Sequence, residues 1–335
     1  MPEVRVDPLS GLRTVVAGER ATRPGAGLTT EPAAPIDPEK DPFLEGHEDR
    51  TPPEVYALRP GGGARDTPGW RVRVVPNLFP ALHPDSPEPE AHADRDLFTA
   101  VPARGAHEVI VNSPLPVTSL ADLEAAQVAV AVDVWRERMR THRGASYVHV
   151  LVNERREGGA SLPHTHAQLY ALDFVPAQIA RERERFGAHA ARTMGGNLLA
   201  DLVQEEVRQR VRVIAIDDEA VLMAPYGARL PYQMMIAPRA VRARFEEDGP
   251  TGAALLHDAL LRLRRRLGAS PPLNLWVRTA PRGAEHFCWR IDIVPRLTHL
   301  AGLELGTGVH LNIVAPERAA AELRECAAPA SGGRP

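Results

Sequence analysis

The sequence predicts an α+β fold made of two halves that repeat one order of elements. Segments typical of strand, strand, helix and strand occur twice, and PYQMMIAP (231–238) takes the place in the second copy that GAHEVIVNSP (105–114) has in the first. The length of 335 residues is enough for two halves with cores of their own. We therefore expect an internal duplication, with halves at residues 1–175 and 176–335.

Turn formers and hydrophobic spacing define the elements of the first half. Residues 4–16 indicate two short strands around a Ser-Gly turn, and residues 70–82 begin as a strand that prolines then break. His107 starts the apolar strand EVIV. Ser119 as N-cap and Gly144 after the last turn delimit an amphipathic helix, and YVHVLVNE follows as a strand.

The second half contains the same kinds of signal. Residues 211–241 indicate three strands separated by turns, and residues 255–267 have apolar positions at helical spacing opposite an arginine-rich face. Residues 273–280 and 286–297 are strand-like. Only the first half has polar residues at alternate positions of its last strand, so we expect one asymmetric site.

Composition excludes several classes of function. The formal net charge is only −3, which gives no electrostatic basis for binding nucleic acid or a membrane surface. Lys40 is the only lysine, which excludes a P-loop lysine. Cys288 and Cys326 cannot form a disulfide framework or a cysteine-rich zinc cluster. Apolar runs of about 20 residues and a signal-peptide core are absent from the sequence, so we expect a cytoplasmic protein.

The stretch SLPHTHAQL (161–169) is the strongest candidate for a functional site. Side chains two apart on a strand point to the same face, so His164, His166 and Gln168 could enter one cavity. A histidine pair is more often a surface or core feature. Here, however, Gly158 and Gly159 supply a flexible turn before the strand, which favours an active-site arrangement.

The sequence resembles the galactose-1-phosphate uridylyltransferases and their relatives in the histidine-triad superfamily. The specific mark is His164-x-His166-x-Gln168, since hydrolase branches have a third histidine in place of the glutamine. The resemblance also includes DPLSG, ERATRP, VVPNLFPAL, ARGAHEVIV, NERREGGASLPHTHAQ and IDIVPRLTHLAGLELGTGVHLN, and so covers nearly the whole chain. It implies a duplicated histidine-triad-like fold in which each half has an antiparallel sheet with packed helices.

The resemblance implies roles for the motif residues. His166 is the expected nucleophile, which attacks a nucleotide α-phosphate and forms a nucleotidyl-histidine intermediate. A neutral imidazole is a competent nucleophile near pH 7. Gln168 is expected to donate a hydrogen bond to the phosphate without activating water. A nucleotide sugar and a phosphorylated acceptor are the expected substrates, and UMP or AMP the transferred group.

Further residues are implied to bind the substrates. By resemblance, Asn77, Asn153, Gly159 and Ser161 contact the nucleotide. From the sequence alone, Arg20 and Arg23 could be phosphate ligands or solvated side chains. By resemblance, they match residues that reach the nucleotide of a neighbouring subunit, so a homodimer is expected. The turn Gly306-Thr307-Gly308 lies where the family binds the sugar phosphate.

Zinc is the one cofactor left open, and no organic cofactor is expected. Many relatives bind zinc through two cysteines and two histidines, and His107 and His164 match those histidines. The knuckle of this chain reads Asp41-Pro42-Phe43-Leu44, without cysteine. Zinc could persist on His107 and His164 with Asp41, and with His47 as a further candidate ligand, or the metal could be lost.

Two other functions stay open. A phosphorylase would use inorganic phosphate to split a nucleotide sugar or a dinucleoside polyphosphate through the same histidine. A protein that binds nucleotides without catalysis would be consistent with the lost metal ligands, although the intact His-x-His-x-Gln motif favours an enzyme.

Overall fold

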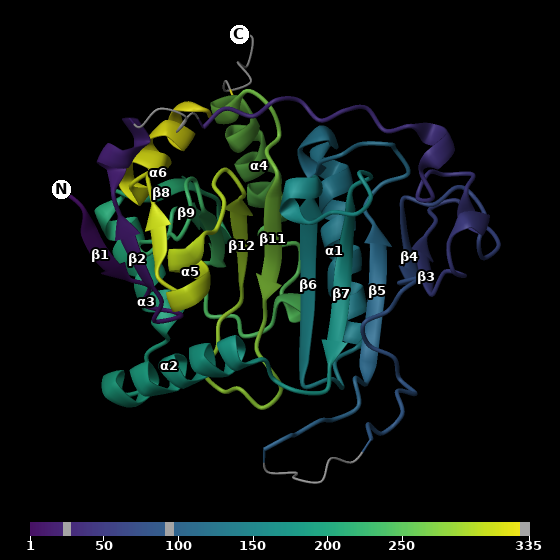
Figure 1. Cartoon of the computed structure of the whole chain (residues 1–335), viewed down its shortest axis with the longest axis horizontal. Coiled ribbons are helices and arrows are strands. Elements are labelled where there is room, and N and C mark those ends of the chain that lie inside the picture. The colour runs from purple at the N-terminus through teal and green to yellow at the C-terminus, as the bar shows by residue number, and fades with distance from the viewer. Residues whose placement is uncertain (23–27, 91–96, 329–335) are drawn as a thin grey trace.

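A single ten-stranded sheet forms the centre of the computed structural model, which describes residues 1–22, 28–90 and 97–328 (Figure 1). All neighbouring strands of this sheet are antiparallel. Their order across the sheet is β3 (Tyr56–Leu58), β4 (Val72–Pro76), β5 (Gly105–Val111), β7 (His166–Leu172), β6 (Tyr147–Glu154), β11 (Leu273–Arg278), β12 (Arg290–Pro295), β10 (Met234–Pro238), β9 (Ala220–Met223) and β8 (Val213–Ile216).

The strand order displays the duplication expected from the sequence. From each edge inward, the first half contributes β3-β4-β5-β7-β6 and the second half β8-β9-β10-β12-β11. Each half contributes an antiparallel sheet of five strands, as the sequence predicts. The two sheets are joined because β6 and β11 pair at the centre, with Asn153 opposite Asn274 and Val152 opposite Leu275. Joining the two sheets removes two edges that would otherwise present unpaired backbone groups.

Two long helices cover one face of this sheet. α1 (Ala125–Thr141) connects β5 to β6, and α4 (Ala253–Leu267) makes the equivalent connection from β10 to β11 (Figure 1). Trp135 of α1 and Leu260 of α4 belong to the same buried cluster as strand residues of both halves. Ser119 caps the short turn Leu120–Asp122, so α1 begins later than the sequence suggests. Burial of Leu120 and Ala121 holds that turn in place.

The remaining elements lie mainly against the second half. α2 (Ala177–Thr193) and α3 (Leu198–Gln209) are not predicted from the sequence. α2 lies across the lower ends of the strands in Figure 1, and Leu199 of α3 belongs to a buried cluster with Val221 of β9 and Met235 of β10. A three-stranded sheet contains β1 (Glu3–Val6), β2 (Arg13–Val16) and β13 (His310–Asn312), with α5 (Gly302–Thr307) and α6 (Pro316–Glu325) beside it. β1 and β2 are the predicted N-terminal hairpin, whereas β13 runs parallel to β2.

The middle of the large sheet has an open face opposite α1 and α4 (Figure 1). Along β6, Val150 and Val152 are fully buried toward the helices, while Leu151 and Asn153 between them are half-buried. Across the described ranges, the helices are all too short or too polar to cross a membrane.

Candidate active site

A cavity of about 310 Å³ opens at the start of β7, on this open face. The apolar parts of its wall are formed by Phe43, Val75, Val109 and Leu162. The polar residues that line it include Asn77, Ser161, His166 and Gln168. The first three apolar residues belong to a small buried cluster of the first half, against which Leu162 packs. The cavity therefore combines a firm apolar wall with a few polar groups, as expected of a ligand site.

The chain reaches β7 through a tight turn. Gly159 has φ 91°, which suits glycine, and a Cβ atom at Gly158 would lie 2.6 Å from the carbonyl oxygen of Leu273. Thr165 then donates its backbone N–H to Val117 at 2.8 Å. The glycine pair therefore lets the turn lie directly against β11, and this fixes where β7 begins.

His166 is held with one nitrogen available to the cavity. Its Nδ1 lies 2.7 Å from the backbone oxygen of His164, and since a carbonyl only accepts, Nδ1 carries the proton. In the neutral ring Nε2 then has a free lone pair. The side chain is buried, and this desolvation lowers the pKa of His166 below its usual value. His166 is therefore a neutral imidazole near pH 7, with Nε2 as its unprotonated nitrogen.

Gln168 lies on the same face of β7, two residues further along. Its Oε1 accepts a hydrogen bond from the hydroxyl of Tyr170 at 3.0 Å and contacts Nε2 of His107 at 3.0 Å. The amide group is thus anchored through its oxygen. Sequence reasoning missed Tyr170, although the same alternation of side chains places it on the face of His166 and Gln168.

His164 does not enter the cavity with the other two motif residues, contrary to the alternation argument. β7 begins only at His166, and the ring of His164 is buried between Asp41 and the backbone of Ser113. Its Nδ1 lies 2.7 Å from Oδ2 of Asp41, and its Nε2 lies 2.8 Å from the carbonyl oxygen of Ser113. His164 therefore ties the motif to the Asp41 segment by hydrogen bonds.

Of the three suggested zinc ligands, Asp41 and His164 lie together, but His107 does not join them. Both ring nitrogens of His164 face oxygen acceptors, and Oδ1 of Asp41 accepts the backbone N–H of Phe43 at 3.0 Å. His107 contacts Asn77 and Gln168 instead. Within residues 1–22, 28–90 and 97–328, groups of three potential His, Cys, Asp or Glu ligands are not found. The assignment of Asp41, His107 and His164 to one metal site is thus corrected, because these residues do not fit zinc.

The four proposed nucleotide contacts lie close to His166. Asn77 and Ser161 line the cavity. Asn153 is on β6, the strand next to β7, and its amide nitrogen is 3.8 Å from the position of a Cβ on Gly159. Sequence reasoning gave no signal for Asn274, whose Nδ2 donates to Asn153 at 2.8 Å and to the carbonyl oxygen of Gly158 at 2.6 Å.

Other predicted residues lie away from the cavity. Arg20 is exposed in a short helix, Gly18–Thr22, whereas Arg23 lies outside the described residues. Gly306 and Thr307 end α5, and Gly308 caps it with φ 70°. α5 lies over the second half, near β2 (Figure 1), so this turn and His166 do not line one cavity within a chain.

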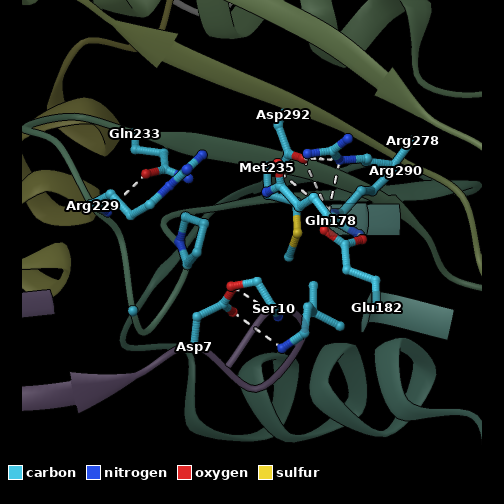
Figure 2. Close-up of a pocket in the computed structure, with 13 residues that line it drawn as sticks. Asp7, Ser10, Gln178, Glu182, Arg229, Gln233, Met235, Arg278, Arg290 and Asp292 are labelled. Carbon is cyan, nitrogen blue, oxygen red and sulfur yellow. Dashed lines mark hydrogen bonds and ion pairs between the residues drawn. The ribbon is translucent and has the colours of Figure 1, made fainter. Parts of the chain in front are cut away.

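The equivalent strand of the second half contains a different polar cluster. Figure 2 shows Arg278, Arg290, Glu182 and Asp292 converging beside a cavity of about 30 Å³. Arg290 donates to Glu182 at 3.0 Å and to Asp292 at 3.1 Å, and this buried pairing raises the pKa of the guanidinium. Asp292 also accepts from Trp276 at 2.9 Å. Because its charges pair internally and the space suits only water-sized molecules, we interpret this cluster as structural.

Comparisons with known proteins agree with this geometry. A family model described as "Galactose-1-phosphate uridyl transferase, N-terminal domain" matches residues 1–176, and one for a domain of unknown function matches residues 118–326. The chain is 28% identical to ADP-glucose phosphorylase of Arabidopsis thaliana, over 97% of this chain and 93% of that protein. It is 27% identical to galactose-1-phosphate uridylyltransferase of Cryptococcus neoformans, over 96% and 89%.

Solved structures show the same fold. The crystal structure of the Arabidopsis ADP-glucose phosphorylase with bound ADP-glucose has a TM-score of 0.78, with 26% identity over 97% of this chain and 98% of that one. A uridylyltransferase structure has a TM-score of 0.74, with 25% identity over 97% and 98%. Fold, cavity and relatives define a nucleotidyltransferase enzyme. Within that class, the chain belongs to the galactose-1-phosphate uridylyltransferase family.

Proposed function

We propose that this enzyme transfers UMP or AMP from a nucleotide sugar to a phosphorylated acceptor through His166. The observation that carries the proposal is the hydrogen bond from Nδ1 of His166 to the carbonyl of His164, which leaves Nε2 as an unprotonated nucleophile at the cavity. Burial keeps the ring neutral. Such a group can attack phosphorus without a separate base.

The reaction divides into two displacements. The Nε2 lone pair of His166 attacks the α-phosphorus, a P–N bond forms, and the bond to the bridging oxygen breaks to release a sugar 1-phosphate. A phosphate oxygen of the acceptor then attacks the same phosphorus, the P–N bond breaks, and neutral His166 is restored. Gln168 offers amide hydrogens to a non-bridging oxygen and has no acid or base function with which to activate water.

The walls of the cavity suit a nucleoside. Phe43, Val75, Val109 and Leu162 provide an apolar surface on which a base can pack. Asn77 and Ser161 supply polar side chains beside it, and we assign Asn153 and Gly159 to the ribose and phosphate side, near β6. Uracil and adenine both remain within the proposal.

The second substrate distinguishes the main proposal from a phosphorylase. A sugar 1-phosphate acceptor makes the enzyme a uridylyltransferase-like transferase, whereas inorganic phosphate makes it a nucleotide-sugar phosphorylase. The similarity to ADP-glucose phosphorylase, in sequence and in fold, specifically favours this second candidate. Both reactions use the same His166 intermediate.

The proposed enzyme is a homodimer located in the cytoplasm. In this dimer, the cavity of each subunit would receive substrate contacts from Arg20, Arg23 and the turn Gly306-Thr307-Gly308 of the other subunit. Their support is the resemblance, together with the position of Arg20 and of this turn away from the His166 cavity of their own chain.

One experiment separates these functions. The protein is incubated with UDP-glucose or ADP-glucose, each with phosphate or galactose 1-phosphate, and also with diadenosine tetraphosphate plus phosphate. Radiolabel in the nucleotide is followed onto the protein. Turnover with a labelled His166, lost in His166→Ala, supports the enzyme. Undiminished nucleotide binding in both proteins, with neither label nor turnover, would instead identify a binding protein and overturn the proposal.

A further inference from the structure

The oxygen of Gln168 is anchored from two sides by aromatic side chains. Tyr170 and His107 lie opposite each other on β7 and β5, and their rings stack with centroids 4.0 Å apart and planes at 23°. The Tyr170 hydroxyl and Nε2 of His107 each lie 3.0 Å from Oε1 of Gln168. Which end of the amide faces the cavity therefore depends on what these two groups donate.

A backbone amide determines the proton position on His107. The N–H of Ala81 lies 3.1 Å from Nδ1 of His107, and because a backbone N–H only donates, Nδ1 must accept. Burial lowers the pKa of His107 and so favours the neutral ring. A neutral ring with an accepting Nδ1 carries its proton on Nε2. That N–H can face the oxygen of Gln168 but not its NH₂ group.

We propose that His107 is a positioning residue that turns the NH₂ group of Gln168 toward the phosphate on His166. The proposal rests on the proposed function of His166. With the amide in this orientation, its N–H bonds can stabilise the charge of a non-bridging oxygen. The reversed amide would set a carbonyl oxygen against that phosphate and repel it. The backbone N–H of Ala81 thereby determines, through the proton position on His107, which end of the Gln168 amide faces the phosphate.

The same arrangement leaves Asn77 available to a ligand. Its Oδ1 accepts from the backbone N–H of Phe79 at 2.9 Å, so its Nδ2 points toward Nε2 of His107, 3.1 Å away. That ring nitrogen already carries a proton and cannot accept. The amide hydrogens of Asn77 therefore remain for a nucleotide in the cavity that this residue lines.

Steady-state kinetics of four variants tests the positioning role. His107→Phe keeps the stacked ring but removes the donor, so we expect kcat to fall roughly 10- to 100-fold with KM changed less than about threefold. His107→Gln, which restores a donor, should recover part of kcat. Once Gln168→Ala has removed the amide, adding His107→Phe should slow turnover by no more than about twofold.

The same kinetic measurements can also refute the positioning role of His107. An active wild-type enzyme whose His107→Phe variant keeps kcat within about twofold overturns it. A double variant that multiplies both losses also overturns it, because the histidine would then act independently of Gln168.

A spectroscopic measurement separates this inference from the proposed function. Long-range ¹H–¹⁵N correlation spectra of protein labelled at its histidine rings report the His107 tautomer without any substrate. We expect a neutral ring protonated at Nε2 at pH 7. A ring protonated at Nδ1, or a cationic ring, overturns the positioning role. Failure of the wild-type protein to turn over any nucleotide substrate would instead count against the proposed function.

Discussion

Asn274 of β11 connects the second half of the molecule to the turn before His166 by donating to both Asn153 and Gly158. The two hydrogen bonds measure 2.8 and 2.6 Å, and its own oxygen accepts from Arg296 at 3.1 Å. The pairing of β6 with β11 therefore does more than join the two halves. Asn274, from the half that lacks the motif, also braces the loop that leads into His166.

Removal of this brace should reduce turnover. Asn274→Ala leaves the oxygens of Asn153 and Gly158 without their donor, so we expect kcat/KM to fall about tenfold, which corresponds to roughly 1.4 kcal/mol. The free energy of unfolding should fall by about 1 kcal/mol. Kinetics and urea denaturation measure the two effects. Gln209→Ala, at the exposed end of α3, is the control, and unchanged activity in Asn274→Ala would refute the bracing role.

The pH dependence of the first half-reaction should report the neutral His166. Desolvation lowers the pKa of His166 below the ordinary 6.5, so the nucleophile stays unprotonated as the pH falls through that value. We expect the single-turnover rate of nucleotidyl-enzyme formation to be constant from pH 8 to 6.5 and to fall only at lower pH. Rapid-quench measurement of the labelled protein gives this rate. A midpoint at or above pH 6.5 is the contrary result.

The sequence predicts much of this arrangement because the information is local. Alternation along SLPHTHAQL places His166 and Gln168 on one face, and the glycine pair marks the turn before them. The partner of His164 is not predictable in this way, since Asp41 lies 123 positions away and only the folded chain brings it near. The pairing of β6 with β11 and the contact of His107 with Gln168 are likewise properties of the sheet register.

Glu154 should make the stability of the protein depend on pH. This carboxyl is buried, and desolvation raises its pKa to about 7 from 4.5, against the opposing hydrogen bonds from Ser119 and Leu120. A raised pKa in the folded state favours folding at low pH, so this contribution is complete below pH 4.5 and is lost as the pH rises through 7. The free energy of unfolding should therefore fall by up to roughly 3 kcal/mol across this pH range.

Denaturation of Glu154→Gln at several pH values checks this prediction. The amide can still accept from Leu120 and donate to Ser119, so the variant should unfold with a weaker pH dependence than the wild type between pH 4.5 and 7. Glu205→Gln, an exposed carboxylate on α3, should keep the wild-type slope. Equal slopes in the wild type and Glu154→Gln would show that Glu154 is not the titrating group.

The knuckle at Asp41 should hold its structure without zinc. Since His164 and Asp41 already satisfy each other and the backbone, we expect purified protein to contain well under one zinc per chain. A chelator should leave the unfolding temperature unchanged. Structural zinc typically contributes on the order of 10 kcal/mol, so its removal would be unmistakable. Stoichiometric zinc, with a large loss of stability on chelation, would restore Asp41 and His164 as ligands.

Arg290 should be among the most sensitive positions of the second half. It is buried and donates to Glu182 and Asp292. Arg290→Met would leave these two buried carboxylates with only Arg278, whose Nε lies 3.7 Å from each. Removal of one partner from a buried ion pair costs about 3–5 kcal/mol, which we expect as the loss in free energy of unfolding. Arg208→Met removes an exposed pair with Glu205 and should leave the urea concentration at the midpoint of unfolding essentially unchanged. If the two variants unfold at the same urea concentration, Arg290 does not stabilise the second half, and the structural interpretation of the cluster in Figure 2 is wrong.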